Sequence, residues 1–152
     1  MRITKASTNA HVQNLKKNSR AIPLPLEETF SNLVGLLEPV QASFEIRVNN
    51  PQHYELWTTH IYRTFSQKAR YKKGLMFASV IVFSKFVSFY FYPLYLNKEL
   101  KNQLSDELKP FVGGESCFRF KKPDDIPHSE LNRLISDGFA YYSGQGWIEE
   151  KS

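Results

Sequence analysis

The sequence predicts an α+β fold, in which helices cover one face of an antiparallel β-sheet. Two observations lead to this prediction. Apolar residues recur at helical spacing near both ends of the chain, while short runs of aromatic and β-branched residues, typical of strands, fill the middle. The resulting order is helix, several strands, helix, strand and helix, which is typical of a sheet with its helices on one side. Since the chain has 152 residues, a single domain with one core is expected.

The first part of the chain is predicted to form a helix and two strands. The helix covers residues 25–38, because Pro25 suits the first helical turn and Pro39 ends the apolar pattern. A short strand is expected at 44–48, where apolar and charged residues alternate. A second strand is expected at 54–62, which is rich in aromatic and β-branched residues.

Residues 75–96 form a nearly uncharged run as long as a membrane span. Lys85 lies near its middle, where a charge costs about 2.5 to 3.5 kcal/mol, and Pro93 adds a further penalty. A hairpin explains the run better, because LMFASVIVF and FVSFYFY each have the length and composition of a strand. The connection between them is expected at Ser84 and Lys85, and no membrane span is expected.

The last third is predicted to contain helix, strand and helix. Leu96, Leu100, Leu104 and Leu108 fall four apart before Pro110, so a helix is expected at 97–109. A short strand is expected at 117–121. A final helix follows Asp124 and Asp125, where apolar residues from Leu131 onward trace one stripe.

The positive charge is concentrated at the start of the chain. The net charge is +5, and residues 1–20 contain five basic and no acidic residues, which leaves 15 of each in the remainder. We therefore expect residues 1–22 to form a flexible basic segment, 23–148 the folded domain, and 149–152 a short tail. The acid-free start also resembles a transit peptide, but its apolar content is thin.

Enzyme signatures are missing from the sequence. It has no Gly-rich phosphate loop, G-x-S-x-G, H-E-x-x-H or C-x-x-C motif, which favours a protein that is not an enzyme. Cys117 is the single cysteine and is read as a small buried residue rather than a nucleophile. With one cysteine and no recognisable secretion signal, a cytoplasmic location is expected.

The second strand of the hairpin suggests a ligand surface. In FVSFYFYP, Val87, Phe89 and Phe91 are expected to face the helices. The opposite side then carries the candidate ligand-binding residues Ser88, Tyr90 and Tyr92, with Lys85 close by. The simpler alternative is that the tyrosines only cover this face with their hydroxyls in water.

The sequence also contains candidate residues for a metal site and for a nucleic-acid site. Asp124 and Asp125, with His128 and Glu130, offer ligands for a divalent metal, although capping of the last helix is the favoured reading. His53 and His60 fall on opposite faces of a regular strand, which argues against a shared metal.

A run of basic residues, Lys68, Arg70, Lys72 and Lys73, follows the second predicted strand. It suits phosphate contacts, but no recognised motif accompanies it, so nucleic acid is not the expected partner.

Three stretches, YKKGLMFASVIVFSKFVSFYFYPLYL, LSDELKPFVGGESCFRFKK and DDIPHSELNRLISDGFAYY, resemble the YdhG-like family of small bacterial domains. The similarity runs from about Leu26 to Trp147 and includes the strand ending at Pro93, the Gly114 turn and Cys117. The resemblance implies an α+β domain and assigns no activity. We therefore expect a non-enzymatic binding or accessory domain whose ligand or protein partner is unknown.

The resemblance also implies an alternative, since some members of the family are regarded as frataxin-like iron chaperones that serve iron–sulfur cluster or haem assembly. Frataxins bind iron on an acidic ridge of the first helix and the adjoining strand. Here that helix offers Glu27 and Glu28, to which Asp124 and Asp125 can be added. Because the ridge is sparse, no cofactor is expected, and iron is retained only as the second hypothesis.

Overall fold

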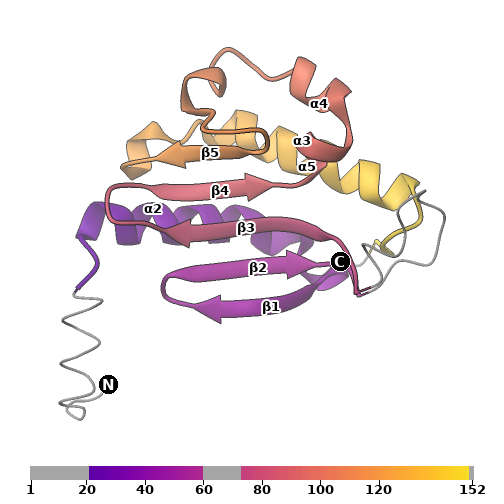
Figure 1. Cartoon of the computed structure of the whole chain (residues 1–152), viewed down its shortest axis with the longest axis horizontal. Helices are drawn as coiled ribbons and strands as arrows, with labels where there is room; N and C mark the ends of the chain where they lie inside the picture. The colour runs from indigo at the N-terminus through magenta and orange to yellow at the C-terminus, as the bar shows by residue number, and fades with distance from the viewer. Residues whose placement is uncertain (1–20, 60–72, 151–152) are drawn as a thin grey trace, which may run out of the picture.

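The computed structural model describes residues 21–59 and 73–150 and shows a five-stranded sheet with helices (Figure 1). Every neighbouring pair of strands is antiparallel, and the strands follow their order in the chain. The strands are β1 (Glu45–Asn50), β2 (His53–Trp57), β3 (Met76–Val82), β4 (Val87–Phe91) and β5 (Cys117–Phe120). The α-helices are α2 (Leu24–Leu37), α3 (Pro93–Leu96), α4 (Lys98–Asn102) and α5 (His128–Gly144). The predicted α+β fold is confirmed.

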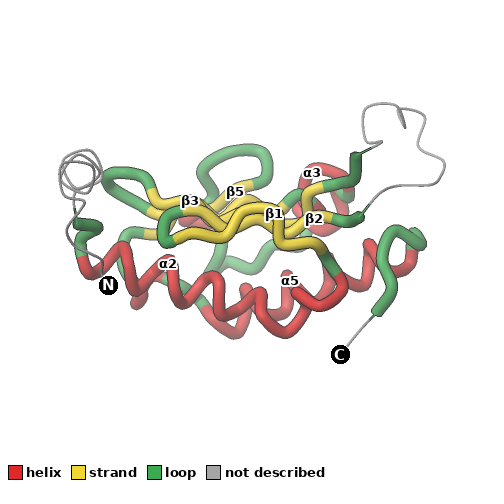
Figure 2. Tube along the Cα trace, turned by 90° about the horizontal axis from the view of Figure 1, so that it is seen from below, coloured by secondary structure: helices red, strands yellow, loops and turns green. Residues whose placement is uncertain are grey.

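The two long helices, α2 and α5, lie side by side on one face of the sheet (Figure 2). Each buries an apolar stripe, which includes Leu33 and Leu37 on α2 and Leu131 and Ile135 on α5. These side chains meet aromatic residues of the central strands, and the core forms between the two layers. Neither long helix covers the opposite face of the sheet (Figure 2).

The hairpin formed by β3 and β4 matches its prediction. The amide of Phe83 donates to the carbonyl of Phe86, so Ser84 and Lys85 form the connection. Phe89 and Phe91 are fully buried, and the ring of Phe91 lies directly against α5 at Gly138. The expected orientation of β4 is therefore correct, with its phenylalanines facing the helices.

The predicted helix at 97–109 is wrong. Only α4 forms, and the chain leaves the helix at Gln103 before a 3-10 turn at Lys109–Phe111. The leucines that suggested a helix, Leu100, Leu104 and Leu108, are nevertheless all buried. Irregular turns bury these leucines no less completely than a helix would. Tertiary packing therefore overrides the local periodicity here.

The predicted capping of the last helix is also wrong. Asp124 and Asp125 belong to a 3-10 turn, Pro123–Asp125, and α5 begins only at His128 with Pro127 at the N-cap and no side-chain cap. A carboxylate oxygen of Asp125 instead accepts a hydrogen bond from the amide of Lys121, at 3.2 Å. The aspartate closes its own turn and does not serve α5.

Two strand predictions need smaller corrections. The strand expected at 44–48 is observed as β1, which begins and ends later, with an irregularity between Ile46 and Val48. The strand expected at 54–62 begins one residue earlier and ends at Trp57, and residues 60–62 lie outside the described part of the chain. Within that described part, no helix is long and apolar enough to cross a membrane.

Candidate functional site

The sheet face opposite α2 and α5, which we call the open face, carries three rows of side chains. Because strand residues alternate between faces, residues in register with Ser88 and Tyr90 share their side of the sheet. The central row runs Val48, Glu55, Ser79, Tyr90, Cys117. The second row runs Asn50, His53, Ile81, Ser88, Arg119. The third row runs Glu45, Trp57, Met76.

Glu55 is the centre of a hydrogen-bond network on this face. Its Oε2 accepts from His53 Nε2 at 2.7 Å and from Ser79 Oγ at 3.4 Å. Its Oε1 accepts from the indole N–H of Trp57 at 2.8 Å. We call His53, Glu55, Trp57 and Ser79 the Glu55 network. The Glu55 side chain is only 18% exposed, so the network holds a mostly buried carboxylate in one orientation.

Arg47 braces the network from the edge of the sheet. Its guanidinium lies 4.7 Å from the centre of the Trp57 ring, in a cation–π contact, and its Nε is 2.8 Å from Oε1 of Glu45. The same guanidinium donates to the carbonyl oxygens of Thr58 at 3.0 Å and Lys73 at 2.6 Å. Arg47 thus ties the end of β2 to the residues that precede β3, and holds the Trp57 ring in place beside Glu55.

The end of β2 is fixed further by backbone geometry at Gly74. Gly74 has a φ of 112°, and a Cβ at this position would lie 2.5 Å from the carbonyl oxygen of Thr58. Only glycine tolerates both conditions. Thr58 Oγ1 then accepts from the amide of Leu75 at 2.9 Å, which keeps β2 and β3 in register where Trp57 joins the network.

Ser88 and Tyr90 continue the open face on β4. Ser88 is buried, and among the described residues its Oγ has no hydrogen-bond partner. Tyr90 is half-buried in the same row as Glu55 and Ser79. The structure therefore places two of the predicted ligand residues, Ser88 and Tyr90, in rows that also contain residues of the Glu55 network.

Two other predicted ligand residues lie apart from this group. Lys85 is exposed at the tip of the β3–β4 hairpin, outside the three rows. Tyr92 lies beyond the end of β4, where it precedes α3 and stacks on Tyr95 with ring centres 5.2 Å apart. Tyr92 also packs against the hydrophobic core, so its ring contributes to the stability of the fold.

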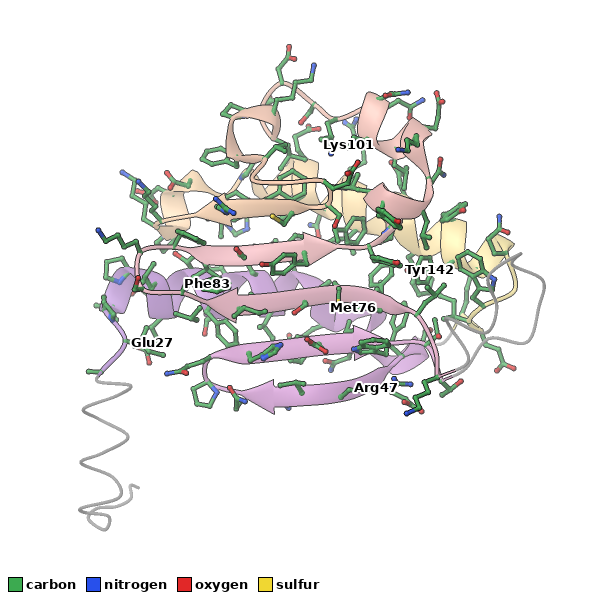
Figure 3. All side chains as sticks on the ribbon, viewed as in Figure 1. Glu27, Arg47, Met76, Phe83, Lys101 and Tyr142 are labelled. Atoms are coloured by element: carbon green, nitrogen blue, oxygen red, sulfur yellow. The ribbon has the colours of Figure 1, made fainter. Side chains whose placement is uncertain are left out.

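The proposed metal ligands do not form a cluster. Glu27 and Glu28 are exposed on α2, and Glu27 lies toward the opposite end of the molecule from Arg47 (Figure 3). Asp124 and Asp125 sit in their own turn before α5. Within residues 21–59 and 73–150, no group of three or more His, Cys, Asp and Glu side chains is arranged to hold a metal ion.

The proposed phosphate-binding run lies mostly outside the described residues, which exclude Lys68, Arg70 and Lys72. Lys73 is described and is exposed, and its carbonyl oxygen accepts the Arg47 hydrogen bond given above.

Cys117 is a buried free cysteine at the end of the central row, in agreement with the prediction of burial.

A signal for the Glu55 network was present in the sequence. In HYELW, polar or amphipathic residues alternate with Tyr54 and Leu56, which are both buried. Side chains two residues apart on a strand share a face, so His53, Glu55 and Trp57 had to be neighbours. Ser79 could not be added from the sequence, because its place beside Glu55 depends on the register between β2 and β3.

Comparisons of the chain with protein-family models, curated proteins and solved structures give no match. The functional argument therefore rests on the geometry of the open face.

Proposed function

We propose that this chain is a non-enzymatic binding domain that recognises a polar ligand on its open sheet face. The observation that carries the proposal is the Glu55 network, a mostly buried carboxylate with three hydrogen-bond donors on the face opposite the helices. The three donors hold the Glu55 carboxylate in one orientation, and they replace solvation that a carboxylate loses on burial. A rigid, pre-oriented acceptor is well suited to recognition.

The chemistry of the neighbouring side chains indicates the kind of ligand. An ionised carboxylate has about four lone-pair positions, and three donors leave room for one more. The Ser88 hydroxyl has no partner among the described residues, and Tyr90 adds an aromatic ring with a hydroxyl. These features support a ligand that donates a hydrogen bond to Glu55 and lies against Tyr90.

The same geometry argues against nucleophilic catalysis. In a catalytic triad, a histidine base contacts the hydroxyl nucleophile and a carboxylate orients the histidine. Here Glu55 lies between His53 and Ser79 and binds both, and no hydrogen bond joins His53 to either Ser79 or Ser88 among the described residues. The carboxylate thus occupies the place that the base would need.

Membership of the YdhG-like family and a cytoplasmic location belong to the same proposal. The observed α+β fold agrees with the fold that the resemblance implies. Iron delivery stays the second hypothesis, and no contact among the described residues favours it over ligand binding at the open face.

A screen of small polar compounds by ¹H–¹⁵N NMR tests the proposal. Compounds that bind should shift amide signals in β2, β3 and β4 together, and the Glu55→Gln variant should lose these shifts. Glu107→Gln is the matched control, since Glu107 is exposed and lies outside the three rows. If the same compounds bind the Glu55→Gln variant with unchanged affinity, the proposed site is wrong.

A further inference from the structure

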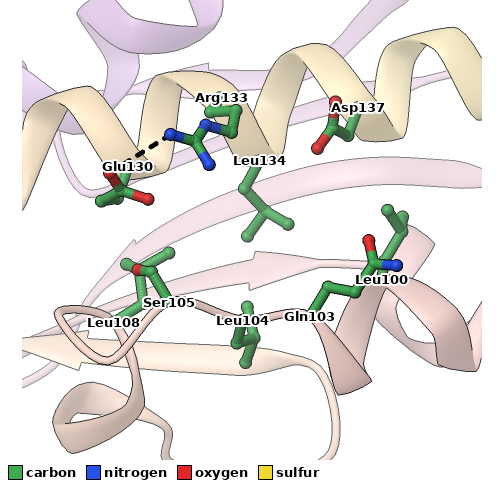
Figure 4. A pocket seen from close by; sticks show the side chains of 9 residues that line it. All are labelled: Leu100, Gln103, Leu104, Ser105, Leu108, Glu130, Arg133, Leu134 and Asp137. Carbon is green, nitrogen blue, oxygen red and sulfur yellow. Dashed lines mark ion pairs between the residues drawn. The ribbon is translucent and has the colours of Figure 1, made fainter.

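A separate pocket lies between α5 and residues 100–108 (Figure 4). It has a volume of about 180 Å³, and it exists because the chain leaves α4 early and does not continue as a helix. A protein cavity of about 150 Å³ binds benzene, so the pocket suits a group of about six non-hydrogen atoms. None of its lining residues belongs to the open face.

The inner part of the pocket is apolar. Leu104 and Leu108 come from the irregular segment, and Leu134 comes from α5. All three are at least 90% buried, with exposures of 8%, 2% and 6%. Little of each leucine side chain is exposed, so these residues give the pocket a small apolar floor, which suits the short hydrocarbon part of a polar ligand.

The rim of the pocket has an excess of negative charge. Arg133 lies 3.7 Å from Glu130, so the charges of these two α5 residues offset each other. Asp137, one further turn along the same helix, has no ion pair among the described residues. The lining then carries two carboxylates and one guanidinium, which leaves one negative charge without a counterion.

Two further groups can accept hydrogen bonds from a ligand. The amide Nε2 of Gln103 donates a hydrogen bond to Glu99 at 3.2 Å, and the carbonyl oxygen of Gln103 can accept a hydrogen bond from a ligand. Ser105 lines the pocket, and its Oγ is buried without a hydrogen-bond partner among the described residues. A buried hydroxyl without a partner costs free energy, and a ligand atom that forms a hydrogen bond with it would offset this cost.

We propose that this pocket binds a small aliphatic ammonium compound. Its hydrocarbon part packs on Leu104, Leu108 and Leu134, and its charged nitrogen lies at the rim beside Asp137. In Figure 4, Asp137 and Gln103 lie toward the same end of the pocket, and both offer oxygen atoms that accept hydrogen bonds from an ammonium group at that end.

The test uses three probes of nearly equal size with the full chain. These are n-pentylammonium, 1-pentanol and pentanoate, each titrated at low salt and followed by ¹H–¹⁵N NMR. We expect saturable shifts at residues 100–108 and 130–137 with the ammonium compound, and weaker binding of the other two. Raising the salt concentration should weaken ammonium binding, because an exposed ion pair is screened.

A substitution at the rim of the pocket shows how much of the binding depends on the charge of Asp137 rather than on the shape of the pocket. Asp137→Asn keeps the size of the side chain and should weaken pentylammonium binding about threefold to fivefold, the effect of one partly exposed ion pair. Glu107→Gln removes a charge from the same region without altering the lining and should leave binding unchanged. Pentanol binding as tightly as pentylammonium, preferential binding of pentanoate, or no saturable shift with any probe would each overturn the proposal.

Discussion

Gly138 of α5 lies against the ring of Phe91 in β4, and its substitution by alanine tests the packing of the two layers. A Cβ at this position would lie 2.4 Å from Cζ of Phe91, 2.7 Å from Cε2 of the same ring and 2.9 Å from Cγ of Pro93. These distances are well below the contact distance of two carbon atoms, about 3.5 to 4.0 Å. Gly138→Ala therefore requires α5 or the Phe91 ring to move.

The expected change in the free energy of unfolding of Gly138→Ala is the difference between two opposing effects. Alanine in a helix is more favourable than glycine by about 0.5 to 1 kcal/mol, whereas an extra methyl group in a packed core costs about 1 to 3 kcal/mol. Phe91 cannot easily give way, because it is fully buried and its ring centre lies 5.1 Å from that of Phe77. We expect Gly138→Ala to lower the free energy of unfolding by about 1 to 2 kcal/mol.

Gly35 in α2 provides the matched control. A Cβ there would meet nothing within 4 Å, so Gly35→Ala should raise the free energy of unfolding by about 0.5 to 1 kcal/mol through the helix term alone. Urea denaturation of both variants measures the two changes, provided that the m-value is unchanged. If Gly138→Ala is as stable as the Gly35→Ala variant, the close approach of α5 to Phe91 is wrong.

Three further predictions concern the core, the pH dependence and iron. Phe89→Ala should lower the free energy of unfolding by about 3 to 5 kcal/mol, since Phe89 is 0% exposed, and a loss below about 1 kcal/mol in urea denaturation would contradict the assigned face of β4. Burial raises the pKa of Tyr54 above its usual value of 10.0, and Glu38 raises this pKa further. The folded state therefore holds the phenolic proton of Tyr54 more tightly than the unfolded state does. The stability that the protonated Tyr54 contributes to the fold is fully present below pH 10 and is lost as the pH rises through the pKa of the folded state. The thermal midpoint should fall above pH 10 less steeply in Tyr54→Phe than in the wild type, and equal slopes would refute the assignment. Anaerobic calorimetry should show ferrous iron binding no tighter than roughly 10⁻⁴ M, because few acids converge, whereas a micromolar constant lost in the Glu27→Ala, Glu28→Ala double variant would favour the iron hypothesis.

The sequence predicted best those elements whose periodicity and burial agree. The α2 stripe and the alternation in β4 each place apolar residues on one side, and the structure buries that side. The β3–β4 hairpin followed from the same rule, since a charge and a proline excluded a membrane span from the run that contains Lys85.

Local periodicity predicted the wrong secondary structure at residues 97–109, where irregular turns bury the leucines that a helix was expected to bury. Leu104 and Leu108 kept helical spacing but reached the core through irregular backbone, and this produced the pocket beside α5. The open face was only partly predictable, because alternation along β4 gave Ser88 and Tyr90, whereas the contact between Glu55 and Ser79 depends on pairing across strands.

Native mass spectrometry of the full chain, purified without denaturation, tests most directly whether the open face is a binding surface. The wild-type protein should retain a non-covalent ligand that is lost in Glu55→Gln and in Tyr90→Ala. The first variant replaces one carboxylate oxygen, an acceptor, by a donor NH₂ group, and the second removes the aromatic ring. Glu107→Gln should retain the ligand. A ligand that stays bound at full occupancy in both open-face variants, while their folding is unchanged, would contradict the assignment of the site to the Glu55 network.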